Sequence, residues 1–178
     1  METSPEILKH KARNIRYFFC DVDGTLTDGT VYYSPDGELL KCFSLRDGTG
    51  FFLLRQCGIK TGIITTEESQ IVAQRAKKLA VDTYIYGSQN KTESIREFLF
   101  DKDLSFKNIA YIGDEINDLK LIRQCGLSFA VADADHRVID AADVVCDHKG
   151  GNGAFREAVE SLLTLLDVNI SNIIEKKL

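Results

Sequence analysis

Apolar and polar positions follow one another along the chain in a pattern that predicts strands and helices in turn. Short apolar runs, typical of buried strands, occupy residues 17–20, 59–64, 81–86, 109–112, 127–131 and 144–146. Between them, apolar residues recur at helical spacing, as at Val72, Ala76 and Leu79. Strands that alternate with helices predict an α/β fold, a doubly wound, Rossmann-like parallel sheet with right-handed crossovers.

Two segments depart from this alternation. The turn sequence Ser34-Pro35-Asp36-Gly37 lies between two short strand patterns and predicts a β-hairpin inserted at about residues 30–44, too small for a cap domain. The helix after it is predicted to begin at Asp47 or Gly48, and a last helix to cover about residues 153–178. At 178 residues we expect one domain, 1–178.

Composition and charge restrict the partners. A net charge of −5 does not support nucleic-acid binding, which needs a concentrated basic surface. The 5 cysteines are scattered without CxxC spacing, which favours a reduced protein over a zinc site. The chain shows neither an apolar run of membrane-spanning length nor the apolar centre of a signal peptide near its start. We therefore expect a cytoplasmic protein with no membrane partner.

Candidate chemistry begins directly after the first apolar run. Asp21 and Asp23 follow it, and Gly24 allows the chain to turn there. Two carboxylates at the carboxyl end of a buried strand are costly unless a cation or a phosphate lies beside them. Asp21 is placed to attack phosphorus and form an aspartyl phosphate, and Asp23 to protonate the leaving alcohol and then deprotonate water. A solvated turn or a calcium-like loop is the alternative.

Two further polar residues stand where phosphate contacts are expected. Thr65 ends the second strand pattern and offers a hydroxyl group, and Lys91 begins a helix after a loop and supplies a cation. Taken alone, Thr65 could cap a strand end and Lys91 could be a surface cation. Their order along successive strand ends favours a phosphate site.

Carboxylates also end a later strand. Asp114 follows the run at 109–112, and Asn117 and Asp118 come shortly after it. Asp114, Asp21 and the carbonyl of Asp23 would form an oxygen-rich site suited to Mg²⁺. The alternative is that these acidic residues only cap the following helix.

The order Asp21/Asp23, Thr65, Lys91, Asp114/Asp118 resembles the four signatures of the haloacid dehalogenase (HAD) superfamily of phosphate-transfer enzymes. An aspartate two residues after the nucleophile resembles its phosphatases and mutases rather than its ion-pumping ATPases. The resemblance implies a Mg²⁺ cofactor, with phosphate contacts from Gly24, Thr65, Thr66 and Lys91 and supporting contacts from Asn117 and Asp118.

Three other stretches resemble a narrower family: Asp28-Gly29 with the hairpin, 46–50 (RDGTG) and 150–157 (GGNGAFRE). They are similar to the capless phosphatases of 3-deoxy-2-keto sugar acids. These include the 3-deoxy-D-manno-octulosonate 8-phosphate phosphatases, the nonulosonate (sialic-acid-like) 9-phosphate phosphatases and a domain linked to some cytidylyltransferases. The resemblance implies a phosphorylated sugar acid as substrate. It also implies a homotetramer in which hairpins pack together and a neighbouring subunit covers each active site.

The residues that would choose between the two substrates disagree. Glu67, after Thr65-Thr66, and Lys78 resemble the nine-carbon 9-phosphate type, whereas Arg46 resembles the eight-carbon 8-phosphate type. We expect Glu67 to contact substrate hydroxyls in its own subunit, and Arg75 and Lys78 to reach a neighbour's site. Arg75 is the candidate for the substrate carboxylate. The alternative is that Glu67, Arg75 and Lys78 are ordinary polar residues on a solvated helix face.

Three other functions share parts of this pattern. A phosphomutase has the same nucleophile and metal site, but this chain lacks room for the cap domain that such enzymes usually carry. A non-catalytic tetrameric scaffold of sugar-nucleotide synthesis would tolerate loss of the catalytic residues, which are all present here. A receiver-like domain that accepts phosphate on an aspartate shares the sheet and the Mg²⁺ chemistry but gives no reason for Asp23-Gly24-Thr25.

Overall fold

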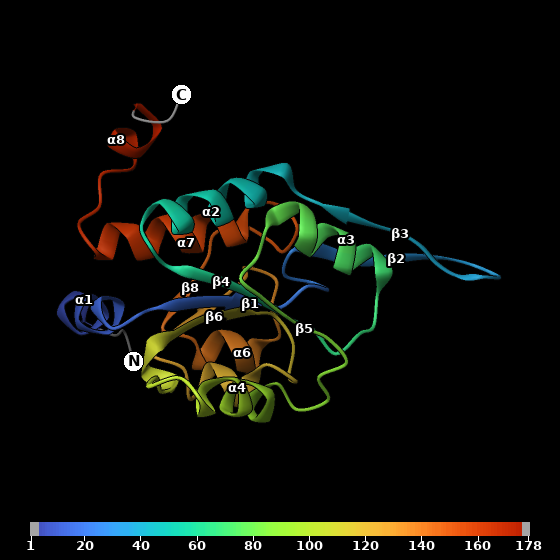
Figure 1. Cartoon of the computed structure of the whole chain (residues 1–178), viewed down its shortest axis with the longest axis horizontal. Helices are drawn as coiled ribbons and strands as arrows, with labels where there is room; N and C mark the ends of the chain where they lie inside the picture. Colours follow the sequence, from blue (N-terminus) through green and yellow to red (C-terminus); the bar gives the residue numbers. More distant parts are fainter. Residues whose placement is uncertain (1–3, 176–178) are drawn as a thin grey trace.

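A computed structural model describes residues 4–175. Its centre is a six-stranded sheet of order β5-β4-β1-β6-β7-β8, in which every neighbouring pair is parallel (Figure 1). The strands are β1 Tyr17–Cys20, β4 Lys60–Ile64, β5 Thr83–Ile85, β6 Ile109–Gly113, β7 Leu127–Ala130 and β8 Val144–Val145. The predicted α/β fold with a doubly wound parallel sheet is confirmed.

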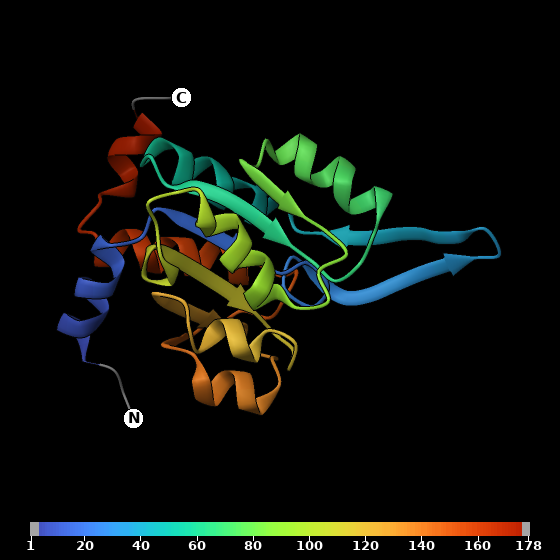
Figure 2. The same cartoon turned by 60° about the horizontal axis from the view of Figure 1, so that its bottom comes forward.

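Helices cover both faces of the sheet (Figures 1 and 2). One face carries α2 Leu45–Gln56, α3 Gln70–Leu79 and α7 Ala154–Leu165, and the other carries α4 Lys91–Phe100, α5 Leu119–Ile122 and α6 His136–Ala141. Helix α1, Pro5–Arg13, lies near the amino end of β1. Within residues 4–175, no helix has the length and apolar composition needed to cross a bilayer.

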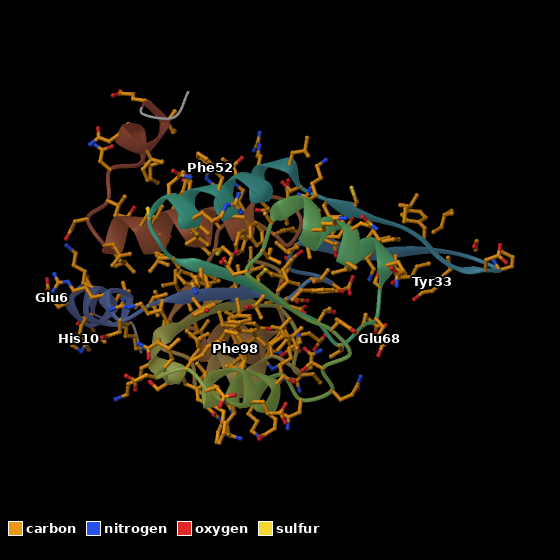
Figure 3. The ribbon with its side chains drawn as sticks, viewed as in Figure 1. Glu6, His10, Tyr33, Phe52, Glu68 and Phe98 are labelled. Carbon is orange, nitrogen blue, oxygen red and sulfur yellow. The ribbon has the colours of Figure 1, made fainter. Side chains whose placement is uncertain are left out.

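The first strand is also the centre of the core. All four residues of β1 are buried, because strands and helices surround it on every side. On the α2 and α7 face, Phe18 stacks with Phe129 at 5.5 Å between ring centroids, and Phe51 stacks with Phe155 at 4.3 Å. On the other face, Phe98 of α4 packs edge-on against Phe19 (Figure 3). This packing fixes the carboxyl end of β1, which the two aspartates follow.

The predicted hairpin is present and extends away from the body of the molecule (Figures 1 and 2). Strands β2 Thr27–Ser34 and β3 Gly37–Phe43 pair antiparallel, so the hairpin begins three residues earlier than the expected boundary. Its arm exposes large side chains, among them Tyr33 (Figure 3) and Leu39, which are 66% and 61% accessible. Its base lies beside the loop that carries Asp23.

Helix α2 begins earlier than predicted, at Leu45 rather than at Asp47 or Gly48. The Ser44 side chain accepts hydrogen bonds from the backbone N–H groups of Arg46 and Asp47, which satisfies two donors of the first turn. The apolar pattern starts only at Phe51 and therefore conceals this first turn. In the sequence, Ser44 stands three residues before Asp47, and this spacing indicates a helix that begins directly after Ser44.

The expected single helix over about 153–178 is wrong. Helix α7 ends at Leu165, and a second helix, α8, covers Ile170–Glu175; residues 176–178 lie outside the described part. Asp167 adopts a left-handed conformation, φ 57°, and the N–H groups of Asp167 and Val168 donate to the carbonyls of Thr164 and Leu163. This is a Schellman cap. It ends the helix without the glycine that usually marks such a turn.

Candidate functional site

The carboxyl ends of β1, β4 and β6 meet at a cavity of about 360 Å³. Side chains and backbone from three strand ends and from the hairpin line it. The predicted residues among them are Asp21, Asp23, Gly24, Thr65, Thr66, Glu67, Asp114 and Asn117. The structure therefore brings together, at one edge of the sheet, most of the residues that the sequence places at separate strand ends.

Asp21 and Lys91 form a buried ion pair behind this cavity. The Lys91 ammonium donates to Asp21 Oδ1 at 2.6 Å and to Asp118 Oδ1 at 2.6 Å. Burial alone would lower the pKa of Lys91, but the charges and hydrogen bonds of the two aspartates outweigh it and hold that pKa above its ordinary value. Lys91 is therefore a fixed positive charge beside Asp21.

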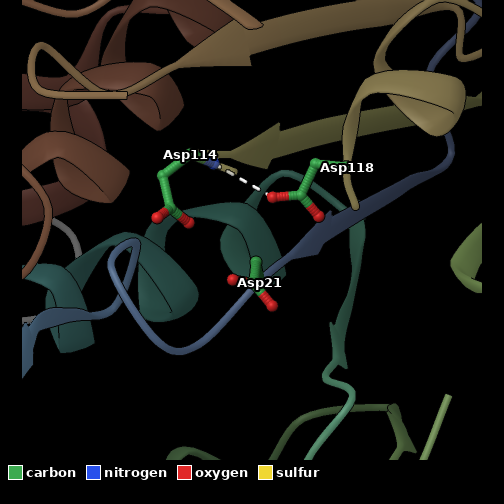
Figure 4. Close-up of side chains that lie close together, drawn as sticks. All are labelled: Asp21, Asp114 and Asp118. Atoms are coloured by element: carbon green, nitrogen blue, oxygen red, sulfur yellow. Dashed lines mark hydrogen bonds between the residues drawn. The ribbon is translucent and has the colours of Figure 1, made fainter. Parts of the chain in front are cut away.

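Asp118 is fully buried, and four donors occupy its two oxygens. Its Oδ1 accepts from Lys91 and from the Tyr111 hydroxyl, at 2.5 Å, and its Oδ2 accepts from the backbone N–H groups of Asp114 and Glu115. Figure 4 shows the bond to the Asp114 N–H. Asp118 thus holds the Lys91 ammonium and the Asp114 loop in place. These contacts are compatible with the supporting role that the resemblance implies for Asp118.

Asp21 and Asp114 face each other at the edge of the sheet (Figure 4). One oxygen from each of Asp21, Asp114 and Asp118 lies within 4.8 Å of the others. Burial raises the pKa of Asp21 to about 6, and burial together with the negative charges of Asp21 and Asp118 raises the pKa of Asp114 to about 8. A divalent cation between them would remove this penalty, so the oxygen donors fit a hard metal ion such as Mg²⁺.

Gly24 is required by the close approach of the loop to Asp114. Its φ is 88°, and a Cβ atom there would lie 2.0 Å from Asp114 Oδ2. The next residue, Thr25, is buried and donates its hydroxyl hydrogen to Asp114 Oδ1 at 2.9 Å. The Gly24 N–H, a predicted phosphate contact, donates to the Thr27 hydroxyl at 3.3 Å. The loop therefore orients the second carboxylate as well as the first.

Thr65 is buried at the end of β4 and lines the cavity. Its hydroxyl oxygen accepts from the Glu67 N–H at 3.1 Å, and its backbone N–H donates to the Ile85 carbonyl. Among residues 4–175 the hydroxyl hydrogen has no acceptor, so it is available to a ligand oxygen, as the predicted phosphate contact requires.

The sequence did not indicate Lys41, which lies on β3 of the hairpin and lines the same cavity. Its side chain is 2% exposed, and its ammonium donates to Asp23 Oδ1 at 2.5 Å. Thr25 and Tyr111 are further residues of the site that were not singled out. Thr25 directly follows Asp23-Gly24 in the sequence and could have been found there, whereas the hairpin pattern holds no comparable signal for Lys41.

The two motifs at 46–50 and 150–157 contact each other and support the Asp21 loop. Asp47 Oδ1 accepts from the Arg156 N–H at 2.9 Å in the first turn of α7. The Gly151 N–H donates to the Thr25 carbonyl at 2.9 Å, and a Cβ atom on Gly150 would lie 1.7 Å from the Gly24 carbonyl oxygen. These glycines allow the second motif to pack directly on the backbone of the first aspartate loop.

Three predicted substrate contacts lie outside the cavity of Asp21. Arg46 is exposed in the first turn of α2, and Arg75 and Lys78 line a separate groove of about 540 Å³ beside α2 and α3. Arg75 donates to the Ser44 carbonyl at 2.9 Å and lies over the Phe43 ring at 5.3 Å. Within this subunit the three residues do not reach the site, and the contact of Arg75 and Lys78 with a neighbour's site stays a prediction.

Comparison with known proteins gives consistent results. Residues 59–157 match the haloacid dehalogenase-like hydrolase family. The chain is 36% identical over 156 residues to the 3-deoxy-D-manno-octulosonate 8-phosphate phosphatase KdsC of Haemophilus influenzae, covering 88% of this chain and 87% of the relative. It is 38% identical over 160 residues to the enzyme of the same name from Salmonella typhimurium, covering 90% and 85%.

Solved structures agree with the sequence relatives. The 3-deoxy-D-manno-octulosonate 8-phosphate phosphatase of Moraxella catarrhalis, in complex with a magnesium ion, a phosphate ion and a KDO molecule, superposes with a TM-score of 0.91 at 34% identity, covering 98% of this chain and 99% of that one. The chain therefore belongs to the haloacid dehalogenase-like hydrolases and, within them, to the family of the 3-deoxy-D-manno-octulosonate 8-phosphate phosphatases, which are phosphoric monoester hydrolases.

Proposed function

We propose that this protein hydrolyses the phosphate monoester of a 3-deoxy-2-keto sugar acid through an aspartyl-phosphate intermediate on Asp21. The observation that carries the proposal is the setting of Asp21, a carboxylate that directly follows the central strand, lines the cavity and is held at 2.6 Å by a buried ammonium. Burial next to Lys91 orients the nucleophile and gives the transferred phosphoryl group a fixed cation.

In the first step, an oxygen of Asp21 forms a bond to phosphorus while the bond from phosphorus to the ester oxygen breaks. The electron pair of the broken bond stays on the ester oxygen, which takes a proton from Asp23. The products of this step are the free alcohol and phosphorylated Asp21. Thr65 and Lys91 would hold the oxygens of the phosphoryl group during the transfer.

In the second step, water attacks the phosphorus of phosphorylated Asp21 and gives a proton to Asp23. The bond between phosphorus and Asp21 breaks, its electron pair returns to the carboxylate, and inorganic phosphate leaves. Asp23 acts as acid and then as base, so both residues return to their starting forms.

We also propose a Mg²⁺ cofactor, held by Asp21, Asp114 and the carbonyl of Asp23. The oxygen donors and the raised pKa values of the two carboxylates support it. The bound cation would screen the repulsion between the phosphate dianion and the Asp21 carboxylate. The Moraxella catarrhalis enzyme with magnesium and a Haemophilus influenzae enzyme in a cobalt-bound form, at TM-score 0.84 and 36% identity over 88% of this chain and 92% of that one, support a divalent metal.

For the substrate, 3-deoxy-D-manno-octulosonate 8-phosphate is the first candidate, because the relatives carry that name. A nine-carbon acid 9-phosphate is the second, and one observation favours it. Glu67, which resembles the nine-carbon type, lines the cavity, whereas Arg46, which resembles the eight-carbon type, does not. A carboxylate in this position is suited to accept hydrogen bonds from the hydroxyl groups of a longer sugar chain.

The test is phosphate release from the two sugar-acid phosphates side by side, with Mg²⁺ and again with a chelator. We expect a large preference for one of them, loss of activity in the chelator, and loss of activity in Asp21→Asn. Glu67→Ala should lower kcat/KM for the preferred ester more than for a small aryl phosphate.

Two results would contradict the proposal. If the folded protein releases no phosphate from any ester, the scaffold function becomes the better explanation. If it converts one phosphate ester into an isomer without releasing phosphate, it is a mutase.

A homotetramer is proposed with this function, on the family resemblance and on the exposed apolar arm of the hairpin. Tyr32, Tyr33, Leu39 and Leu40 are all exposed along that arm. Light scattering of the purified protein should give a mass about four times that of the chain, and Tyr33→Asp with Leu39→Asp should lower it.

A further inference from the structure

Lys41 is a buried cation that the chemistry above does not use. It comes from strand β3 of the hairpin, where its neighbours Leu40 and Cys42 are both exposed, yet its own side chain is 2% exposed. A lysine is rarely buried to this extent unless its ammonium is paired. Its position therefore calls for an explanation beyond the solvation of a hairpin.

Two carboxylates hold the Lys41 ammonium. It donates to Asp23 Oδ1 at 2.5 Å and lies 3.1 Å from Glu38 Oε1. Glu38 in turn accepts a hydrogen bond from the hydroxyl of Ser69, the N-cap residue of α3. Lys41 is thus fixed from both the hairpin and α3. Burial lowers its pKa, but its bonds to Asp23 and Glu38 outweigh this effect and raise it, so the side chain stays charged.

The two oxygens of Asp23 differ sharply. Oδ1 accepts from Lys41, whereas Oδ2 is buried and has no hydrogen-bond partner among residues 4–175. A buried oxygen without a partner is costly, and such atoms often belong to a functional site. Asp23 lines the cavity together with Asp21, and Oδ2 is the oxygen of its carboxylate that Lys41 leaves unbound.

We infer that Lys41 is a positioning residue for Asp23: it fixes Oδ1, so that Oδ2 carries the proton exchanged with the ester oxygen and with water. The inference rests on the proposed function. When Oδ2 gives its proton to the departing ester oxygen, Asp23 becomes a carboxylate, and the Lys41 ammonium stabilises that negative charge. When Asp23 takes the proton from water in the second step, Oδ2 becomes protonated again. Lys41 itself gains and loses no proton.

This inference makes a specific demand on the leaving group. A 4-nitrophenolate ion leaves without a proton, but an alkoxide does not. Lys41 should therefore matter for alkyl esters and hardly at all for 4-nitrophenyl phosphate. A lysine that only secured the hairpin would affect both esters equally.

The experiment compares kcat/KM for benzyl phosphate and 4-nitrophenyl phosphate, two esters of similar size. This constant covers the steps up to release of the alcohol, so it reports on the transfer to Asp21 and does not include the hydrolysis of phosphorylated Asp21. For Lys41→Met we expect a fall of about 30- to 100-fold with benzyl phosphate, at or below the lower end of what general acid catalysis contributes, because Asp23 itself remains in place; with 4-nitrophenyl phosphate we expect a fall of less than about threefold. Lys41→Arg, which keeps the cation, should recover most of the loss.

Lys77→Met is the matched control, since it removes one positive charge from the exposed face of α3. Equal loss for both esters in Lys41→Met, or no loss for benzyl phosphate, would overturn the inference while leaving the phosphatase function intact. Failure of the wild-type protein to hydrolyse either ester would instead reject the proposed function.

A second measurement serves if Lys41→Met folds poorly. Glu38→Gln keeps the Lys41 cation but weakens its hold, and it should lower benzyl phosphate turnover by a smaller factor in the same selective way. In an Asp23→Asn background the same change should alter kcat/KM by less than about twofold, because Lys41 acts through Asp23. An undiminished effect of Glu38→Gln in that background would contradict the inference.

Discussion

The aromatic layer beneath α2 and α7 and the carboxylates at the sheet edge are both buried, but they have opposite energetics. In the layer, two stacked pairs, Phe18–Phe129 and Phe51–Phe155, are joined by an edge-on contact between Phe18 and Phe155, and each contact favours the folded state. At the edge, Asp21, Asp114 and Asp118 lie together, and burial and mutual repulsion raise the pKa of the first two.

The difference shows where stability and chemistry reside in this fold. Packing in the aromatic layer stabilises the folded state. The carboxylates at the sheet edge destabilise it, and the fold tolerates them because the layer contributes more. Asp118, with all its lone pairs occupied by donors, belongs to the scaffold although it stands inside the cluster. Substitutions in the layer should therefore affect stability, whereas substitutions of Asp21 and Asp114 should affect activity and leave the fold intact.

The largest effect is expected for Asp21→Asn, which keeps the shape of the side chain and removes the proposed nucleophile. We expect kcat to fall by about 10⁴-fold, equivalent to ~5.4 kcal/mol of transition-state stabilisation. The thermal midpoint in a chelator should not fall, because the variant removes a charge from a repelling pair. Steady-state kinetics and thermal unfolding on the same sample test both; a variant that loses its fold would show that Asp21 is needed for stability.

The next largest effect lies in the aromatic layer. Phe51→Ala removes a fully buried ring and should destabilise the protein by about 3–5 kcal/mol. Activity per folded molecule should change little, since the ring does not line the cavity. Denaturant unfolding measures the loss, and Phe100→Ala is the control, because Phe100 is 87% exposed and its loss should cost at most ~0.5 kcal/mol. Equal losses in the two variants would remove the distinction between the regions.

The smallest effect has the opposite sign. In a chelator, Asp114→Asn should stabilise the protein by about 1–2 kcal/mol at alkaline pH while abolishing activity. The folded-state pKa of Asp114, about 8, exceeds the ordinary value of 3.8 for an aspartate, so ionisation destabilises the fold increasingly as pH rises between these values. The stabilisation should therefore grow with pH across that window.

Thermal midpoints of wild type and Asp114→Asn at several pH values measure this difference, with the exposed neighbour Glu115→Gln as control. Mg²⁺ should raise the midpoint of the wild-type protein and have little effect on Asp114→Asn. A variant that is less stable than wild type at alkaline pH would show that contacts of the Asp114 carboxylate outweigh the repulsion between the carboxylates at this edge.

Much of the site follows from the sequence because it depends on topology. The carboxyl ends of parallel strands meet at one edge, so residues following three separate strands, such as Asp21, Thr65 and Asp114, converge without any further information. Helix α4 begins at Lys91 as predicted, and that start places the ammonium within hydrogen-bond distance of Asp21.

The remainder depends on contacts that no local pattern encodes. Lys41 is buried because the base of the hairpin returns to the Asp23 loop, and its strand carries exposed residues on either side of it. Arg75 resembles a free cation on a helix face, but it packs against Phe43 and donates to Ser44. The break between α7 and α8 relies on a left-handed aspartate where a glycine is usual.

The contact between Gly151 and the loop after β1 also bears on the order in which the protein is made. The Gly151 N–H donates to the Thr25 carbonyl, so the loop of the first aspartates is completed by residues synthesised more than a hundred positions later. The strand before that loop, β1, pairs with β4 and β6, and both of these strands come later in the chain. Strand β1 therefore cannot take its place in the sheet until they have been synthesised. A nascent chain released before residue 151 therefore lacks a finished active site, and activity is among the last properties acquired at the ribosome.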